Sequence, residues 1–296
     1  QYLPEFVIGG DAPVGPMKSG DSVVLFNFRG DRALEISQAF EADEFKSFDR
    51  GDRPQLRYAG MMEYDGDLHI PARYLVSPPE IDRPMSAYLS NAGVAQFGCS
   101  ETQKFGHVTY FWNGNRSDRY DHEAYLEIKS DNLPFNQRPW MKAAQITDAA
   151  IKTLAEEQHN LLRLNYANCD MVGHTGDMRA ARIAVEIVDQ QLGRLLHAIK
   201  KAQAVALITA DHGNADEMFM WDKKTKDFAK KEDGSFVPKT SHTLSPVPLF
   251  LYDARGKAQV ALRPIEDAGL SNVAATAFEL LGFEAPEDYR HSLLKA

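Results

Sequence analysis

Two aspartates and three histidines lie at or near the ends of apolar segments that predict strands: Asp170, His174, Asp211, His212 and His242. The apolar segments are 161–166, 204–208 and 248–252. Because the carboxyl ends of parallel strands meet at one edge of an α/β sheet, we expect these side chains to converge there. Carboxylates and neutral imidazoles together suit Mn²⁺, Zn²⁺ or Mg²⁺. The pattern therefore predicts a site for divalent cations.

Each of these residues also has a plain structural explanation. Asp170 could cap a turn, and we expect a loop around it because Gly173 and Gly176 follow. Asp211 could form an Asx turn, and His242 could be an ordinary exposed histidine. Neighbouring residues of a strand point to opposite faces, so Asp211 and the histidine after it share one ion only if the backbone turns there; otherwise they serve two ions. Two aspartates and three histidines are too few to fill two metal spheres, so further ligands must come from elsewhere.

Two arginines three residues apart, Arg29 and Arg32, lie where a predicted strand meets a predicted helix. A helix N-terminus favours anions, and the guanidinium fork matches phosphate oxygens in pairs. These residues are candidates for a phosphate or carboxylate clamp. The alternative is that Arg32 forms a weak surface ion pair with Asp31 or Glu35.

Lys104 is the other candidate for a phosphate contact. It lies between the strand-like segment 94–98 and the aromatic residues 110–112. At such a junction an ammonium group can stabilise a transferring phosphate as a point charge. The alternative is an ordinary solvated lysine.

The bulk composition excludes several classes of protein. The formal net charge of −9 over 296 residues argues against a nucleic-acid binder. No apolar run is long enough to cross a bilayer, and the first residues carry no signal-peptide pattern, so we expect neither membrane partners nor export. The two cysteines argue against a disulfide framework and favour a reducing, cytoplasmic setting. The chain does not begin with Met, so we expect it to start inside a longer protein.

Alternation of strand-like and helix-like segments predicts an α/β fold with a mostly parallel sheet flanked by helices. The predicted strands, besides those above, are 22–28, 55–62 and 94–98, and the predicted helices are 31–40, 141–158, 177–201 and 271–282. Asp177 and Ser271 are the expected helix caps. The proline-rich segment 71–84 is the expected linker between domains. The charged segment 221–239 is read as a solvated insertion, with a lid over the site as the alternative.

Five motifs occur in an order that resembles the cofactor-independent phosphoglycerate mutases of the alkaline phosphatase superfamily. They are Asn27–Arg32, Glu101–Phe111, Asn168–Gly176, Thr209–Asn214 and Thr240–Thr243. The resemblance extends over essentially the whole chain. It implies an alkaline-phosphatase-like domain over residues 78–296, preceded by the C-terminal part of a second α/β, transferase domain over residues 1–77. It also implies a monomeric isomerase of glycolysis and gluconeogenesis when the protein is intact.

The resemblance further implies roles for single residues. Asp170, His174 and His242 resemble the ligands of one metal ion, and Asp211 and His212 resemble ligands of another. Both ions are expected to be Mn²⁺, with Mg²⁺, Co²⁺ or Zn²⁺ as alternatives. Lys104 resembles the catalytic phosphate contact, and Arg29 and Arg32 resemble the arginines that bind the phosphoglycerate.

The family interconverts 3-phosphoglycerate and 2-phosphoglycerate through a phosphoserine intermediate. The part of the family pattern that carries the serine nucleophile and a further aspartate ligand is absent from this chain. We therefore expect the chain alone to be inactive and to need an N-terminal half to complete the site. A phosphohydrolase of the same superfamily and a non-catalytic metal-binding module are the competing hypotheses.

Overall fold

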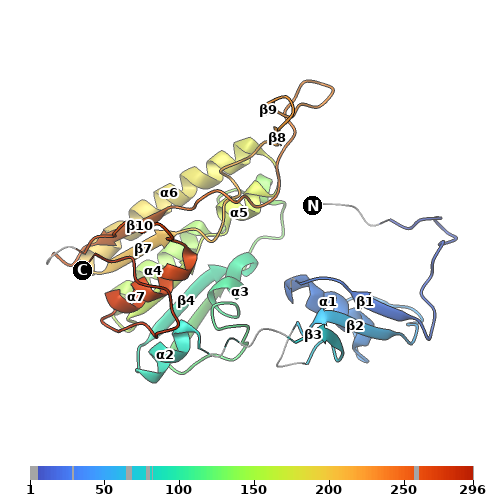
Figure 1. The fold of residues 1–296 in the computed structure, drawn as a ribbon, viewed down its shortest axis with the longest axis horizontal. Coiled ribbons are helices and arrows are strands. Elements are labelled where there is room, and N and C mark those ends of the chain that lie inside the picture. The colour runs from blue at the N-terminus through green and yellow to red at the C-terminus, as the bar shows by residue number, and fades with distance from the viewer. Residues whose placement is uncertain are drawn as a thin grey trace. The chain divides into compact units, whose positions relative to one another are not determined.

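The computed structural model describes residues 6–28, 30–64, 69–77, 81, 83–256 and 260–295. The chain divides into two units, each with its own sheet (Figure 1). The smaller unit contains residues 1–84 and 113–118, and the larger unit contains residues 85–112 and 119–296.

The smaller unit is built on a parallel sheet in the order β1-β2-β3. Its elements are β1 (Ser22–Leu25), α1 (Gly30–Glu41), β2 (Arg57–Met62) and β3 (Tyr74–Val76). Helix α1 packs on β2: the Phe40 and Tyr58 rings stack at 4.9 Å, and the Ser37 and Tyr58 hydroxyls lie 2.9 Å apart. The first predicted strand ends three residues early, and part of the predicted linker forms β3.

The larger unit is built around β4 (Gln96–Glu101), every residue of which is buried. This strand lies between β5 (Glu123–Ile128) and β6 (Leu161–Asn165), and all three run parallel. A second pair, β7 (Val205–Thr209) and β10 (Leu249–Asp253), is antiparallel. The predicted α/β fold is confirmed: the two three-stranded sheets are parallel, and the pairing of β10 with β7 departs from the parallel direction.

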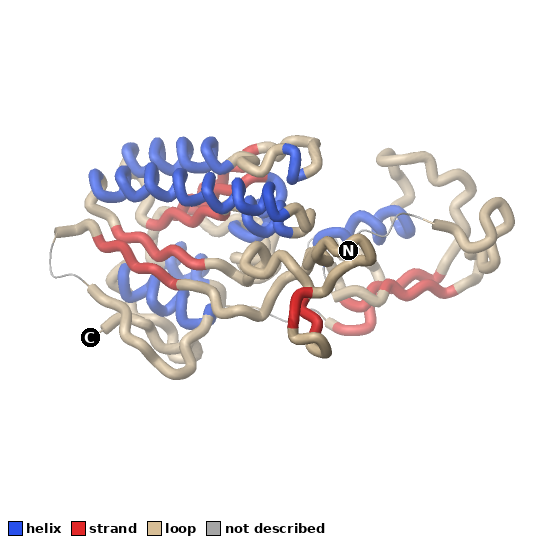
Figure 2. Tube along the Cα trace, turned by 90° about the horizontal axis from the view of Figure 1, so that it is seen from above, coloured by secondary structure: helices blue, strands red, loops and turns tan. Residues whose placement is uncertain are grey.

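Two long helices, α4 (Ala143–Glu156) and α6 (Met178–Lys201), pack on the strands of this unit. Figure 2 shows them together on one side of the strands, with shorter helices on the other. On the α4 side, Ile146 packs against Phe97 and Cys99 of β4. The predicted cap Asp177 is confirmed, because its carboxylate accepts backbone N–H bonds from the second and third residues after it.

Helices α2 (Met85–Asn91) and α7 (Val273–Leu280) share a separate core, in which Leu89 and Phe278 are buried. The prediction that Ser271 caps the last helix is wrong. This residue lies inside a 3-10 turn, η3 (Leu270–Asn272), and the buried Asn272 side chain instead accepts the Gly269 N–H at 2.9 Å. The predicted stop at Gly282 is confirmed, since this residue has a φ of 85° just after α7.

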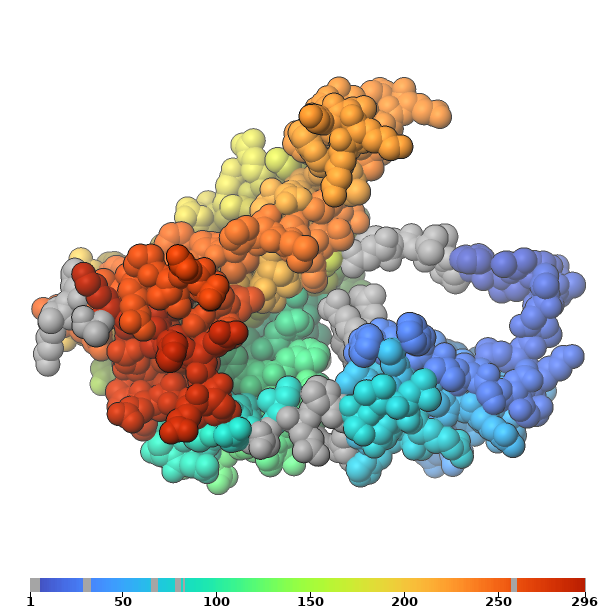
Figure 3. Space-filling view, in the orientation of Figure 1, coloured from blue at the N-terminus to red at the C-terminus, as the bar shows by residue number. Residues whose placement is uncertain are grey.

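The charged segment 221–239 contains a small antiparallel hairpin of β8 (Trp221–Asp222) and β9 (Asp227–Phe228). This hairpin projects from the larger unit and is the orange lobe in Figure 3. The remaining short helices are η1 (Thr102–Lys104), α3 (Phe105–Val108), η2 (Phe135–Gln137) and α5 (Asn168–Gly173). In the part of the chain that the structure describes, no helix combines the length and apolar character needed to cross a membrane.

Candidate metal centre

Asp170 and His174 are brought together by α5, which starts three residues after β6 ends. The prediction of a loop here is wrong, because residues 168–173 form a short helix despite Gly173. One helical turn separates the two residues, so both side chains lie on the same face. The Nε2 atom of His174 lies 3.1 Å from Oδ1 of Asp170.

His242 reaches the same point from a distant loop. Its Nε2 atom lies 3.1 Å from Asp170 Oδ1 and 3.1 Å from His174 Nε2. One carboxylate oxygen and two imidazole nitrogens therefore form a nearly equilateral triangle. In the described ranges, these three residues are the one group of three or more acidic, histidine or cysteine side chains close enough to share a cation.

The hydrogen bonds around His174 fix which ring nitrogen carries the proton. Its Nδ1 atom lies 2.7 Å from the Thr240 carbonyl oxygen, which only accepts, so Nδ1–H is the donor. In the neutral ring the Nε2 lone pair then faces the triangle. Metal-bound histidines commonly donate their other N–H to a carbonyl in this way.

The spacing of the triangle also fits a cation. Ligand atoms that bond a tetrahedral ion at about 2.0–2.2 Å lie about 3.3–3.6 Å from one another. The observed 3.1 Å separations need only a small outward movement to reach that range. The residues present therefore fit a divalent cation in donor type, tautomer and spacing.

Lys104 holds the other oxygen of the same carboxylate. Its Nζ atom lies 2.6 Å from Asp170 Oδ2, and its side chain is only 4% exposed. The alternative of a solvated lysine is therefore wrong. This contact places a fixed positive charge directly beside the candidate metal ligands.

The electrostatics of the cluster favour an ionised carboxylate. Burial raises the pKa of the Asp170 carboxyl, but hydrogen bonds from His174 and Lys104 outweigh burial and hold the pKa well below its usual range. The Asp170 hydrogen bond raises the pKa of His174, whereas burial lowers the pKa of His242. The ionised Asp170 carboxylate therefore supplies negative charge at the point where the two imidazoles meet.

Asp211 and His212 lie immediately beyond β7 and beside this cluster. The His212 ring stacks on the His242 ring with centroids 3.6 Å apart and planes 20° apart. His212 Nδ1 lies 3.2 Å from the Gly213 carbonyl oxygen, and its Nε2 lies 3.5 Å from Asp211 Oδ2. Among the described residues, this pair belongs to no group of three potential ligands. The expectation that this pair holds a second ion therefore stays a prediction.

A backbone bridge explains how His212 and His242 come to stack. Gly213 and Thr243 form an antiparallel bridge in which Thr243 N–H donates to the Gly213 carbonyl at 2.9 Å. A Cβ on Gly213 would lie 2.1 Å from Thr243 Oγ1, so only glycine allows this approach. The Thr243 hydroxyl donates to Asp216 at 2.9 Å, which holds the two loops together. Sequence reasoning missed both Thr243 and Asp216.

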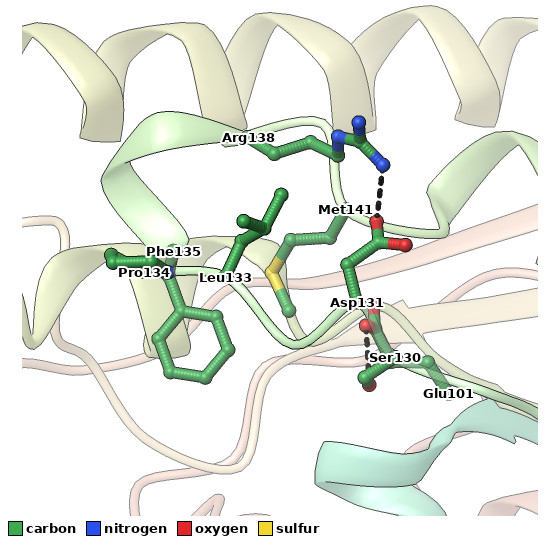
Figure 4. A pocket seen from close by; sticks show the side chains of 8 residues that line it. All are labelled: Glu101, Ser130, Asp131, Leu133, Pro134, Phe135, Arg138 and Met141. Atoms are coloured by element: carbon green, nitrogen blue, oxygen red, sulfur yellow. Dashed lines mark hydrogen bonds and ion pairs between the residues drawn. The ribbon is translucent and has the colours of Figure 1, made fainter.

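A second group that sequence reasoning missed supports the turn bearing Lys104. Glu101, at the end of β4, is 1% exposed and accepts a hydrogen bond from Ser130 Oγ at 2.8 Å. Ser130 Oγ in turn accepts the Gln103 N–H at 3.4 Å, next to Lys104. Figure 4 shows Glu101 and Ser130 at the edge of a small pocket. The pocket is lined by Glu101, Ser130, Asp131, Leu133, Pro134, Phe135, Arg138 and Met141.

The two candidate phosphate-binding arginines are not placed by the structure. Arg29 lies outside the described residues. Arg32 lies in the first turn of α1, but its side chain is outside the described part. Their contribution to the site therefore stays a prediction.

Comparisons with known proteins agree with a metal centre. A sequence model of the Metalloenzyme superfamily matches residues 18–285. The 2,3-bisphosphoglycerate-independent phosphoglycerate mutase of Trypanosoma brucei brucei is 51% identical over 300 residues, which cover 100% of this chain and 54% of that protein. A probable enzyme of the same name from Leptospira interrogans is 51% identical over 298 residues, again with 100% and 54% coverage.

A solved structure of Leishmania mexicana phosphoglycerate mutase at low cobalt concentration superposes with a TM-score of 0.92 at 50% identity. The matched region covers 98% of this chain and 53% of the Leishmania mexicana chain. The α/β fold expected from the sequence is confirmed by this superposition. The chain spans about half the length of the curated relatives it matches.

Proposed function

Because this chain belongs to the Metalloenzyme superfamily, we propose that it is the metal-binding part of a phosphoglycerate mutase. The proposed reaction interconverts 3-phosphoglycerate and 2-phosphoglycerate. The observation that carries the proposal is the triangle of Asp170, His174 and His242 with Lys104 on the same carboxylate. The names of the relatives, which are about half identical to this chain, support the choice of substrate.

We propose that Asp170, His174 and His242 hold one divalent cation and that Asp211 and His212 belong to a second. Imidazole and carboxylate donors suit Mn²⁺, which we propose as the usual ion, and also Co²⁺ or Zn²⁺. The remaining ligands of the second ion, and the nucleophilic serine, are proposed to come from the half of the relatives' length that this chain does not match. On the same basis we propose that residues 1–77 are the end of a transferase domain and that residues 78–296 form a phosphatase-like domain.

When bound, the two cations would stabilise charge on the transferring phosphoryl group and activate the attacking oxygen. The buried ammonium of Lys104 is aimed at the same centre and stabilises negative charge on the phosphate oxygens. Arg29 and Arg32 are proposed to bind the phosphoglycerate, so that the glycerate is retained between removal and return of its phosphate. Retention of the glycerate distinguishes a mutase from a phosphohydrolase.

The test uses the intact protein, expressed from its complete gene, and the 296-residue chain on its own. Phosphorus NMR follows 3-phosphoglycerate, 2-phosphoglycerate and released phosphate in the presence of Mn²⁺. We expect the intact protein to interconvert the two esters with little free phosphate, and the chain alone to be inactive. Net release of phosphate by the intact protein would instead establish the phosphohydrolase hypothesis.

A matched pair of variants ties the activity to the proposed ligands. His242→Ala should abolish turnover, whereas the same change at His197 should leave it unchanged. His197 lies in α6, outside the metal cluster. Full activity of the His242 variant, or rapid turnover by the isolated chain, contradicts the assignment.

A further inference from the structure

We propose that Asn214 is a positioning residue that aims one oxygen of Asp170 at the two imidazoles of the metal triangle. The inference rests on the proposed metal site and adds to it a residue that binds no metal. Asn214 Nδ2 donates to Asp170 Oδ1 at 2.8 Å and to the Asp170 carbonyl oxygen at 3.1 Å. Asn214 is 4% exposed, so these contacts are shielded from water.

The orientation of the Asn214 amide follows from its partners. Both atoms it faces on Asp170 are acceptor oxygens, so the amide nitrogen must point towards them. The amide oxygen is buried and has no hydrogen-bond partner among the described residues. Leaving a buried acceptor unpaired costs free energy, so a contribution to stability alone does not explain this position of the Asn214 amide.

Gly173 makes room for this amide. A Cβ placed on Gly173 would lie 2.4 Å from Asn214 Oδ1, closer than real side chains approach. The glycine therefore lies in α5 because the Asn214 side chain packs directly against the helix there. This explains a glycine whose only evident role in the sequence was to favour a loop.

The contact divides the Asp170 carboxylate between two tasks. Oδ2 faces the ammonium of Lys104 at 2.6 Å, and Oδ1 faces both imidazoles. Of the two carboxylate oxygens, the Asn214 amide donates only to Oδ1, so it opposes a rotation that would turn both oxygens towards Lys104. Without this donor the carboxylate loses its preferred orientation towards the cation.

The same contact joins the two groups of candidate ligands. Asp170 lies in α5 and His174 follows directly after it, whereas Asn214 lies two residues after His212. A hydrogen bond from Asn214 to both the backbone and the side chain of Asp170 fixes one group against the other. Loss of outer partners of metal ligands typically weakens metal binding by about 10–100-fold.

The experiment measures cobalt binding to the intact protein after its native metal has been removed. Co²⁺ is titrated while its visible absorption bands are recorded, because their position and intensity depend on ligand geometry. Asn214→Leu keeps most of the side-chain volume but removes the donor, and Asn214→Ser tests a small residue that suits a turn. We expect both variants to bind Co²⁺ about 10–100-fold more weakly, with altered bands.

Asn272→Ala is the matched control. Asn272 is also a buried asparagine with two hydrogen bonds, but these bonds hold η3 and the C-terminal segment, away from the cluster. The control should lower thermal stability while leaving the cobalt affinity and bands of the wild type. Gly173→Ala supplies a second route, because it displaces the Asn214 amide without changing residue 214 and should also weaken cobalt binding.

Wild-type affinity and bands in Asn214→Leu and Asn214→Ser overturn the positioning role. If either fails to fold, retained affinity in Gly173→Ala overturns it equally. If the wild-type protein itself binds no Co²⁺, the proposed metal site fails and this inference fails with it. A wild type that binds Co²⁺ together with insensitive variants refutes the role of Asn214 alone.

Discussion

Replacement of Lys104 by methionine should destabilise the metal-free protein far more than the metal-bound one. The side chains of Lys104 and Asp170 are 4% and 13% exposed, and their charged atoms lie 2.6 Å apart. Removing one partner of a buried ion pair costs about 3–5 kcal/mol. Because Asp170 keeps hydrogen bonds from His174 and Asn214, we take the lower value of about 3 kcal/mol. For a unit of this size that corresponds to a fall in Tm of about 6–12 °C.

A divalent cation should offset much of this loss, since it supplies positive charge to the same carboxylate. The increase in Tm on adding Co²⁺ should therefore be larger in Lys104→Met than in the wild type. Thermal unfolding followed by circular dichroism, with chelator or with excess Co²⁺, measures both quantities. The comparison is between four Tm values, so a general effect of the substitution cancels.

Lys142→Met is the matched control for this experiment. Its Nζ atom also lies 2.6 Å from a carboxylate oxygen, Oδ1 of Asp131, but the Asp131 side chain is 26% exposed and also pairs with Arg138. We expect a loss of about 1 kcal/mol or less, with no dependence on Co²⁺. Equal losses with and without Co²⁺ in Lys104→Met would refute the reasoning that the lysine and the cation share Asp170.

Three further predictions concern the larger unit. Arg163→Met should lose about 3 kcal/mol in urea unfolding, because it removes the cation paired with the buried Glu123 carboxylate, which keeps hydrogen bonds from Tyr120 and Tyr125. Adding Glu123→Gln should recover part of that loss, and strict additivity of the two changes would contradict a direct pair. Burial raises the pKa of the Cys99 thiol to about 11, so iodoacetamide at pH 8 should label it only after unfolding, and rapid labelling of the native protein would refute its burial. Burial also raises the pKa of the Glu101 carboxyl, so ionisation of this group opposes folding. In urea titrations, the stability of the wild type relative to Glu101→Gln should therefore decline as the pH rises from 4 to 7. A difference in stability that stays constant over this pH range would contradict the raised pKa.

Local chemistry made much of the larger unit predictable from the sequence. Asp177 predicts the start of α6, because a carboxylate before an amphipathic segment accepts hydrogen bonds from the free N–H groups of the first helical turn. Gly282 ends the last helix because glycine accepts a positive φ. The aspartates and histidines near strand ends were predicted to meet at one edge of the sheet. His242 precedes β10, and it reaches the edge where β7 ends because β10 runs antiparallel to β7. The structure brings Asp170, His174 and His242 together and stacks His212 on His242.

Features that depend on distant packing were not predictable. Gly173 favours a loop on local grounds, yet it lies in α5 because the Asn214 side chain occupies the space of its missing Cβ. Local sequence favours Ser271 as the helix cap, but the side chain of Asn272 is the one that accepts the Gly269 N–H. The sequence alone shows neither the contact of Gly173 with Asn214 nor the hydrogen bond of Asn272 to Gly269, because both depend on the three-dimensional packing.

The partners of the site residues were also hidden. Nothing local in the sequence reveals that Lys104 is buried against Asp170, since a lysine in a polar segment is usually solvated. The bridge between Gly213 and Thr243 joins residues on either side of the projecting hairpin. That pairing, rather than any motif, is what brings His242 to the cluster.

The proposed function requires one cation bound by Asp170, His174 and His242. X-ray data collected above the cobalt absorption edge, from crystals of the protein grown with Co²⁺, would locate the ion without reference to activity. We predict an anomalous peak bonded to one Asp170 oxygen and to Nε2 of both histidines. A crystal in which cobalt binds elsewhere while these three side chains lie apart would contradict it.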